Sequence, residues 1–240
     1  YRVRPYKEIK NHHSFSEYSY PPHELVKNQR ANIKNHPVLY LSLHPKTSVL
    51  EYIVNQKDDS YNELLSLSVW NVNCDRDIRV INLLNEKTTK GATSFLGLHN
   101  TQSFKEYAES NFNTKDSKYL IELYQYFINS FCVKNNHIFS SYIAHKYLYS
   151  KEHQIDVLIY PSLAQDNTSI NLAFNKNFSD KYLKLKRVYV INSFKKEVKS
   201  PTIYGDVKFF KDNEFEKEMI LDNYTKMYSL LNIDFGDSII

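Results

Sequence analysis

The sequence predicts an α+β fold with a mixed, largely antiparallel sheet and flanking helices. Strand-like segments come first, helical segments follow in the middle of the chain, and strands return after them. Regular alternation of strands and helices would indicate a parallel sheet instead. Of the 240 residues, 42% are hydrophobic and 15% are aromatic, as is typical of a packed globular protein. A chain of this length can fill one core, or form one domain with an appendage.

Hydrophobic periodicity sets the order of the predicted elements. The helix at 117–133 has the strongest pattern, because its apolar residues from Leu120 to Phe131 recur at helical spacing. The predicted strands lie at 1–4, 38–43, 64–72, 78–84, 155–160, 169–174, 183–193 and 203–210, and the predicted helices lie at 45–55, 103–110, 117–133, 140–149 and 214–232.

Two polar side chains lie on the sides of these elements that face away from the predicted core. In the strand at 38–43 the leucines alternate and form the natural core face, so Tyr40 looks the opposite way, where a cleft can lie. In the helix at 45–55, Glu51 falls on a polar flank. Both side chains are therefore candidates for binding a ligand.

Several function classes are excluded by composition and motifs. The net charge of +4 is spread among acidic residues, unlike a nucleic-acid track. No apolar run reaches the roughly 18–20 residues of a membrane span. Only four glycines occur, so a glycine-rich phosphate loop is disfavoured, and no metal-binding motif is present. Cys74 and Cys132 form no disulfide framework, which predicts a reducing cytoplasm.

Three polar residues at element edges suggest a substrate site. Arg30 precedes the strand at 38–43, Glu51 follows it, and Ser162 comes directly after Pro161 at the end of a later apolar strand. A cation, a carboxylate and a hydroxyl suit a substrate that carries phosphate and a sugar. Taken singly, each also fits an ordinary role as a surface arginine, a helix glutamate or a turn serine. Ser162 lacks the glycine-flanked elbow of an acyl-transfer nucleophile, so a serine hydrolase is disfavoured.

The residues around these positions resemble the RES domain, a family named for its arginine, glutamate and serine. The similarity covers about residues 1–192, and its pieces occur in the family's order. The matching pieces are Tyr1-Arg2-Val3-Arg4, Arg30-Ala31-Asn32, the run 37–42, Thr47-Ser48-Val49-Leu50-Glu51, the run 156–162 and Ile170-Asn171-Leu172-Ala173-Phe174.

The chain departs from the family at its glycines. The family's arginine is commonly preceded by glycine, and Gln29 stands there in this chain. Asp156-Val157-Leu158 replaces a run of the Asp-Gly-Ile type, and Asn167-Thr168-Ser169 replaces a glycine-bearing turn.

The resemblance implies an ADP-ribosyltransferase-like fold that cleaves NAD⁺ as its substrate, without a metal. Many members are toxins that deplete cellular NAD⁺ and are neutralised by an Xre-type antitoxin. Some use inorganic phosphate as a co-substrate, which yields ADP-ribose-1″-phosphate and nicotinamide. We therefore expect an NAD⁺ phosphorylase or glycohydrolase that acts as a toxin or defence effector.

In this interpretation the catalytic candidates are Arg30, Glu51 and Ser162. Arg30, with Arg2 as a helper, holds the pyrophosphate, because a planar guanidinium can bind two oxygens at once. Glu51 stabilises the positive charge that develops on the ribose as the nicotinamide bond breaks. Ser162 orients the nicotinamide amide or the incoming phosphate.

Two further residues are candidates for substrate binding. Tyr40 can stack on the nicotinamide or bond a ribose hydroxyl. Asn171 fits substrate contact and a backbone-bonding position at a strand end equally well.

Two other functions fit the same residues. An ADP-ribosyltransferase would modify a protein or nucleic acid, and a degenerate domain would bind NAD⁺ or a partner without catalysis.

We expect residues 1–192 to form the catalytic domain and 193–240 to add a strand and helix packed on it. We also expect a cytoplasmic protein without a membrane partner, and contact with nucleic acid only through an antitoxin. The acceptor and any homo-oligomer are left open by the sequence.

Overall fold

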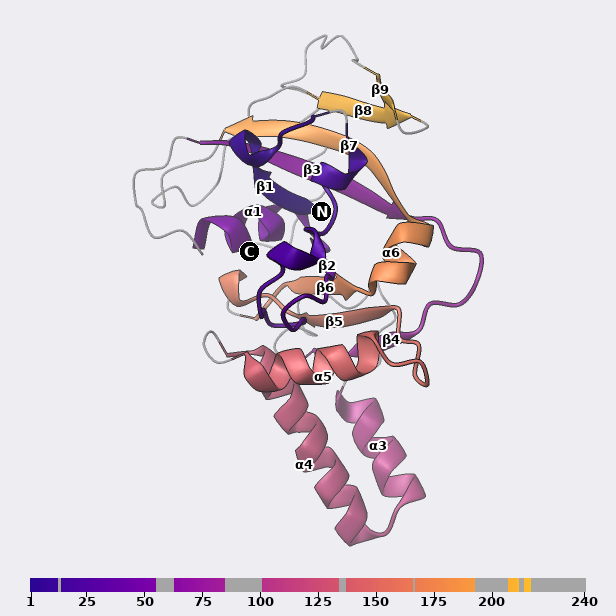
Figure 1. Cartoon of the computed structure of the whole chain (residues 1–240). Coiled ribbons are helices and arrows are strands. Elements are labelled where there is room, and N and C mark those ends of the chain that lie inside the picture. The colour runs from indigo at the N-terminus through magenta and orange to yellow at the C-terminus, as the bar shows by residue number, and fades with distance from the viewer. Residues whose placement is uncertain are drawn as a thin grey trace. The chain divides into compact units, whose positions relative to one another are not determined.

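The computed structural model describes residues 1–12, 14–54, 63–84, 101–133, 137–165, 167–192, 207–211 and 214–216. Across them the protein is mixed α+β, with two sheets and flanking helices, as the sequence predicts (Figure 1). The chain divides into two compact units: the first holds 1–21, 41–75 and 180–240, and the second holds 22–40 and 76–179. The predicted domain boundary at 192 adjoins residues that lie outside the described part of the chain.

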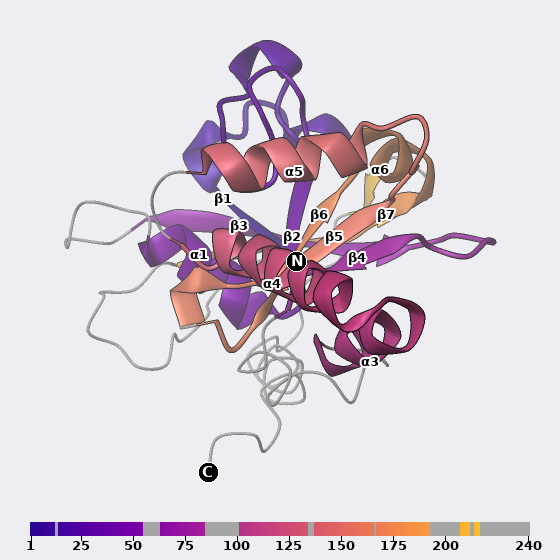
Figure 2. The same cartoon turned by 90° about the horizontal axis from the view of Figure 1, so that it is seen from below.

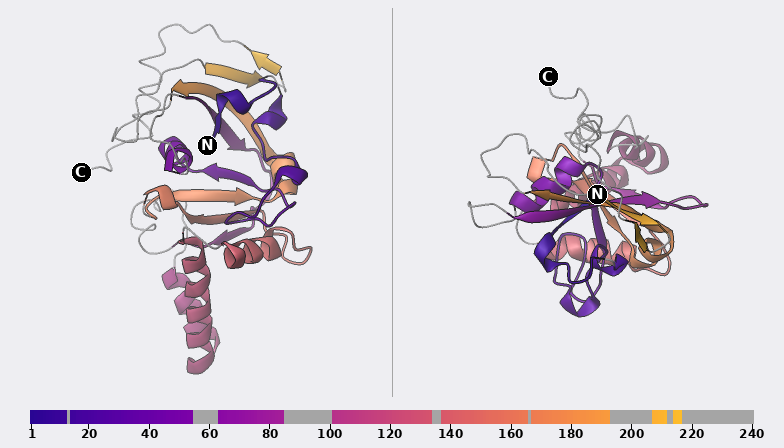
Figure 3. Two further views of the ribbon diagram at one scale, coloured as in Figure 1. Left: turned by 60° about the vertical axis from the view of Figure 1, so that its left-hand side comes forward. Right: turned by 90° about the horizontal axis from the view of Figure 1, so that it is seen from above.

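The first unit is built on a five-stranded sheet in which every pairing is antiparallel. Strands β3 and β7 run side by side over their lengths, interrupted by one register shift between Val69 and Trp70 (Figure 3). In spatial order the strands are β1 (Arg2–Pro5), β3 (Leu64–Val72), β7 (Leu183–Asn192), β8 (Val207–Lys211) and β9 (Glu214–Glu216).

Both faces of strand β3 are covered. On one face Leu65 and Leu67 are buried against Val49 and Ile53 of helix α1 (Pro45–Val54). On the other face the buried residues include Ser68, whose hydroxyl donates to the Arg2 carbonyl at 3.0 Å and accepts from the Trp70 indole at 2.9 Å. Burial of 65–68 on both faces explains why this part of β3 combines leucines with small serines.

The four-stranded sheet mixes parallel and antiparallel pairs. Its order is β2 (Leu39–Ser42), β6 (Ile170–Phe174), β5 (Val157–Pro161) and β4 (Val80–Asn82), with β4 parallel and β6 antiparallel to β5. All five residues of β5 are buried. Because this strand has no exposed face, it forms the centre of the second unit's core.

Helices α3 (Thr101–Asn111) and α4 (Thr114–Phe131) lie side by side as a hairpin, and α5 (Ile138–Leu148) runs across the direction of α4 (Figure 1). In the view from below, α4 is seen foreshortened (Figure 2). Helix α4 begins where the Asn113 side chain accepts hydrogen bonds from the backbone nitrogens of Lys115 and Asp116, at 3.1 and 3.0 Å. This cap places the helix start three residues before the predicted one. The helices and the sheet share one core, which includes Phe131, Ala144, Leu148, Leu158 and Tyr160.

The alternation predicted for β2 is confirmed for Leu39 and Leu41, which are both buried. The opposite face is also largely covered, since Val38 and Ser42 are buried and Tyr40 is half-buried. A strand covered on both faces can keep an alternating pattern where polar groups find partners inside the protein.

Two short elements differ from the predictions. The helix expected at 214–232 is wrong at its start, because residues 214–216 form strand β9; the remainder lies outside the described residues. The alternation Glu-Phe-Glu at that place fits a strand better than a helix. Helix α6 (Lys176–Tyr182), which the pattern did not predict, begins after Asn175, whose side chain accepts from the Phe178 nitrogen at 3.2 Å.

Among the residues that the structure describes, no helix has the length and apolar character needed to cross a membrane.

Asp156 ties the start of β5 to the segment before β4. Its carboxylate accepts two hydrogen bonds of 2.8 Å from the Arg76 guanidinium and one of 2.9 Å from the Arg79 backbone nitrogen. Burial raises the pKa of Asp156, but these hydrogen bonds and the charge of Arg76 outweigh that effect and hold the pKa below its ordinary value. The carboxylate is therefore charged in the folded protein at neutral pH.

We expect Asp156→Asn to lower the free energy of unfolding by about 2 kcal/mol at pH 7, because charge-assisted bonds to Arg76 are lost. Since the folded pKa lies below the unfolded value of about 3.9, this contribution is present above that value and disappears as the pH falls through the folded pKa. Urea unfolding at pH 7 and below about pH 3 checks this. The exposed carboxylate of Asp77 supplies the control, with a change under about 0.5 kcal/mol for Asp77→Asn. A difference that stays equal at both pH values contradicts the prediction.

Candidate functional site

Arg30 lies at the corner of a tight turn in the second unit. The backbone nitrogen of Gln29 donates to the Asn32 carbonyl at 2.9 Å, and the Asn32 nitrogen donates back at 3.3 Å, which leaves Arg30 and Ala31 at the corner. None of these four residues has a positive φ. The backbone of this turn therefore requires no glycine at these positions.

The Arg30 guanidinium contacts two other parts of the same unit. Its Nη1 donates to the Pro161 carbonyl at 2.9 Å and to the Phe131 carbonyl at 3.4 Å. Its Cζ lies 5.1 Å from the centre of the buried Tyr160 ring, within the range of a cation–π contact. Arg30 therefore binds the residue directly before Ser162, although the two hydrogen-bonded residues are 131 positions apart in the sequence.

Ser162 lies in the turn between β5 and β6 and is completely buried. Its nitrogen donates to the Ser169 carbonyl at 2.7 Å, and its carbonyl accepts from the Asn167 nitrogen at 2.8 Å. Asn167 has φ of 62°, in the left-handed region that asparagine tolerates better than most residues. Asparagine therefore forms the left-handed corner of this turn without a glycine.

Tyr40 and Asn171 contact the same structural neighbourhood. The Tyr40 hydroxyl accepts from the Ala31 nitrogen at 2.9 Å and donates to the Asn32 side chain at 2.7 Å. Burial raises the pKa of Tyr40 well above its usual value, and Tyr160 raises it further. Asn171 is buried and lies opposite Tyr160 in the β5–β6 ladder. Arg30, Tyr40, Ser162 and Asn171 are therefore connected through neighbouring residues of one unit.

The other two predicted site residues belong to the first unit. Arg2 on β1 donates to the backbone carbonyls of Tyr18, at 2.8 Å, and Ser19. Burial lowers the pKa of Arg2 to about 9, with a further contribution from Arg4, so the guanidinium keeps its charge at neutral pH. Glu51 is half-buried on α1.

His137 is a residue near Arg30 that no sequence pattern singled out. It immediately precedes α5, and its Nδ1 is buried without a hydrogen-bond partner among the described residues. Burial lowers the pKa of His137, and the charge of Arg30 lowers it further. A single histidine outside any motif gives no sequence signal, because its proximity to Arg30 arises only in the folded chain.

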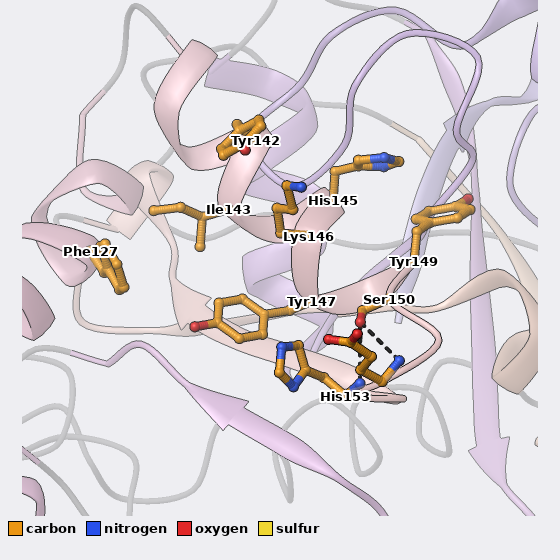
Figure 4. A pocket seen from close by; sticks show the side chains of 10 residues that line it. Phe127, Tyr142, Ile143, His145, Lys146, Tyr147, Tyr149, Ser150 and His153 are labelled. Carbon is orange, nitrogen blue, oxygen red and sulfur yellow. Dashed lines mark hydrogen bonds between the residues drawn. The ribbon is translucent and has the colours of Figure 1, made fainter.

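A separate concavity of about 580 Å³ lies beside α5 and the segment that follows it (Figure 4). Figure 4 shows Tyr147 beside His153, whose rings are 5.5 Å apart, and Ser150, whose hydroxyl accepts from the backbone nitrogens of Glu152 and His153. None of the six predicted site residues lines it. Within the described part of the chain, no group of three or more histidine, cysteine, aspartate or glutamate side chains is arranged to hold a metal ion.

A scan against protein-family models finds no match for this chain, and no curated protein matches it. Support for a function therefore comes from the residues and their geometry.

We expect Asn167→Ala to be about 1 kcal/mol less stable than Asn167→Gly, because both variants lose the amide side chain and only alanine places a Cβ at the positive φ of this position. Glycine usually costs backbone entropy relative to alanine, so this order is the reverse of the ordinary one. Thermal and urea unfolding of the two variants check it. Equal stability, or a more stable alanine variant, would show that the left-handed turn places no demand on this position.

Proposed function

We propose that this protein is an NAD⁺-degrading enzyme, an NAD⁺ phosphorylase or glycohydrolase with an ADP-ribosyltransferase-like fold. The observation that carries the proposal is the contact of Arg30 with the residue before Ser162. These residues belong to two motifs of the RES resemblance that lie far apart in the sequence. A chance match in two unrelated segments would give no reason for them to meet.

Arg30 is the proposed ligand of the pyrophosphate. Its guanidinium is already oriented by the carbonyls of Pro161 and Phe131 and by the Tyr160 ring. Donors that are oriented before the reaction stabilise charge without the cost of reorganisation. A guanidinium also matches the geometry of phosphate oxygens better than an ammonium does.

The reaction breaks the bond between nicotinamide and the ribose carbon. The bonding electrons leave with nicotinamide, which departs neutral, and the ribose takes on oxocarbenium character. Phosphate or water then forms a bond to that carbon, and with water a proton is released. Glu51 is proposed to stabilise the developing cation, as a negative group placed where charge appears. Its role, like that of Arg2 as a helper, rests on the order of motifs in the sequence.

The remaining candidates receive different support from their contacts. Ser162 is proposed to hydrogen-bond the nicotinamide end or the phosphate; its backbone is fixed by bonds to Ser169 and Asn167. Asn171 is a proposed substrate contact from the neighbouring strand. The bonds of Tyr40 to Ala31 and Asn32 favour a role in holding the Arg30 turn over stacking on nicotinamide.

In the cell, the proposed activity is that of a cytoplasmic toxin or defence effector that depletes NAD⁺. An Xre-type antitoxin is the proposed partner, with contact to nucleic acid only through that partner. Self-association is compatible with the proposal and is not required by it.

One observation favours a second candidate function, a domain that binds NAD⁺ without cleaving it. Ser162 is completely buried, so a substrate can reach its hydroxyl only if the surrounding turn moves. A binding domain requires no such movement.

We expect the purified protein, freed of any bound partner, to release nicotinamide from NAD⁺. Glu51→Gln should lower the rate at least about 100-fold, because the stabilising negative charge is removed. The exposed Glu122 on α4 supplies a matched control, and Glu122→Gln should leave the rate and the melting temperature unchanged. Chromatographic product analysis, with and without phosphate, checks both and distinguishes ADP-ribose-1″-phosphate from ADP-ribose.

The other outcomes separate the alternatives. Radiolabel from NAD⁺ on a protein or nucleic acid supports an ADP-ribosyltransferase. NAD⁺ binding by calorimetry without turnover supports the binding domain. If neither nicotinamide release nor NAD⁺ binding occurs in either buffer, the proposed function is wrong.

A further inference from the structure

The turn that carries Arg30 is held by a buried asparagine with three side-chain hydrogen bonds. Asn32 exposes only 2% of its surface. Its Nδ2 donates to the carbonyls of Lys27 and Ile33, at 2.8 and 3.0 Å, and its Oδ1 accepts from the Tyr40 hydroxyl at 2.7 Å. Both hydrogens of the amide nitrogen are thus used. Truncating this side chain would remove these partners from two carbonyls and from the hydroxyl of the half-buried Tyr40.

Tyr40 links this asparagine to the backbone beside Arg30. Its hydroxyl accepts from the nitrogen of Ala31, a completely buried residue, at 2.9 Å. The Tyr40–Asn32 pair therefore fixes the backbone on the C-terminal side of Arg30, while Gln29 and Asn32 close the turn around it.

The far end of the Arg30 side chain is fixed separately, by the carbonyls of Pro161 and Phe131. An arginine held at both its backbone and its guanidinium loses little conformational freedom when an anion binds. A smaller loss of conformational entropy on binding gives a higher affinity for the same contacts.

We propose that Asn32 is a positioning residue that acts with Tyr40 to fix the Arg30 turn, so that the guanidinium is oriented for a pyrophosphate-type oxyanion before that anion arrives. The identity of the anion rests on the proposed function. The positioning of Arg30 does not.

The test compares Asn32→Ala and Tyr40→Phe with the wild-type protein. Nitrogen NMR of the Arg30 guanidinium reports rotation about its Cζ–N bonds, which is slow while Nη1 is held by carbonyls. We expect rotation to become faster in both variants, and the KM for NAD⁺ to rise about tenfold with a smaller change in kcat. Pyrophosphate alone, titrated by NMR, should bind correspondingly more weakly.

Asn175 offers a matched control in the same unit. Its side chain also makes three bonds: its Nδ2 donates to the carbonyls of Leu148 and Ile155, and its Oδ1 accepts from the Phe178 nitrogen. We expect Asn175→Ala to lower the melting temperature while leaving the Arg30 rotation and the KM unchanged. A purely structural role for Asn32 would make the two alanine variants behave alike.

Unchanged Arg30 rotation in folded Asn32→Ala and Tyr40→Phe overturns the proposal, as does an equal change in Asn175→Ala. If Asn32→Ala does not fold, Tyr40→Phe decides the question, because it keeps the bonds of Asn32 to Lys27 and Ile33. If the wild-type protein neither binds nor cleaves NAD⁺, the proposed function fails, while the rotation measurement still decides the positioning.

Discussion

The hydrogen bond from Arg30 to the Pro161 carbonyl is the constraint on which the second unit's candidate site depends. Pro161 ends strand β5 and has no N–H to continue a ladder, so the chain turns there. Its carbonyl accepts the Arg30 guanidinium, and the next residue is Ser162. One interaction therefore fixes the cation, the end of the central buried strand and the start of the serine turn relative to one another.

Asparagine side chains shape several loops of the second unit. Asn32 holds the Arg30 turn, Asn113 caps α4, and Asn175 caps α6 and binds two carbonyls. Asn167 supplies a left-handed corner. Only four glycines occur in the 240 residues, and in these described loops amide hydrogen bonds help to fix the turns. Such turns are fixed by side-chain contacts as well as by backbone freedom.

The regular elements were predictable from the sequence because periodicity reports burial directly. Strand β3 occupies the predicted range 64–72, where apolar residues alternate with small serines. Helix α4 differs only at its start, where the Asn113 cap and not the apolar pattern sets the boundary. Strand β9 was missed because three residues are too short for periodicity to separate a strand from a helix turn.

The candidate site was less predictable, because periodicity says which face is buried and not what covers it. The sequence pointed to Arg30 and Ser162 separately, but their connection through Pro161 is a long-range contact. The place of His137 near Arg30 and the full use of the Tyr40 hydroxyl are also set by tertiary structure.

The left-handed turn at Asn167 shows what a comparison of residue identities cannot detect. Asparagine tolerates the left-handed region better than most residues, so Asn167 keeps the positive φ that the turn requires without a glycine. Sequence profiles reward residue identity and not torsion angles. Two chains with glycine and asparagine at such a corner therefore differ in residue identity while their backbones follow the same path.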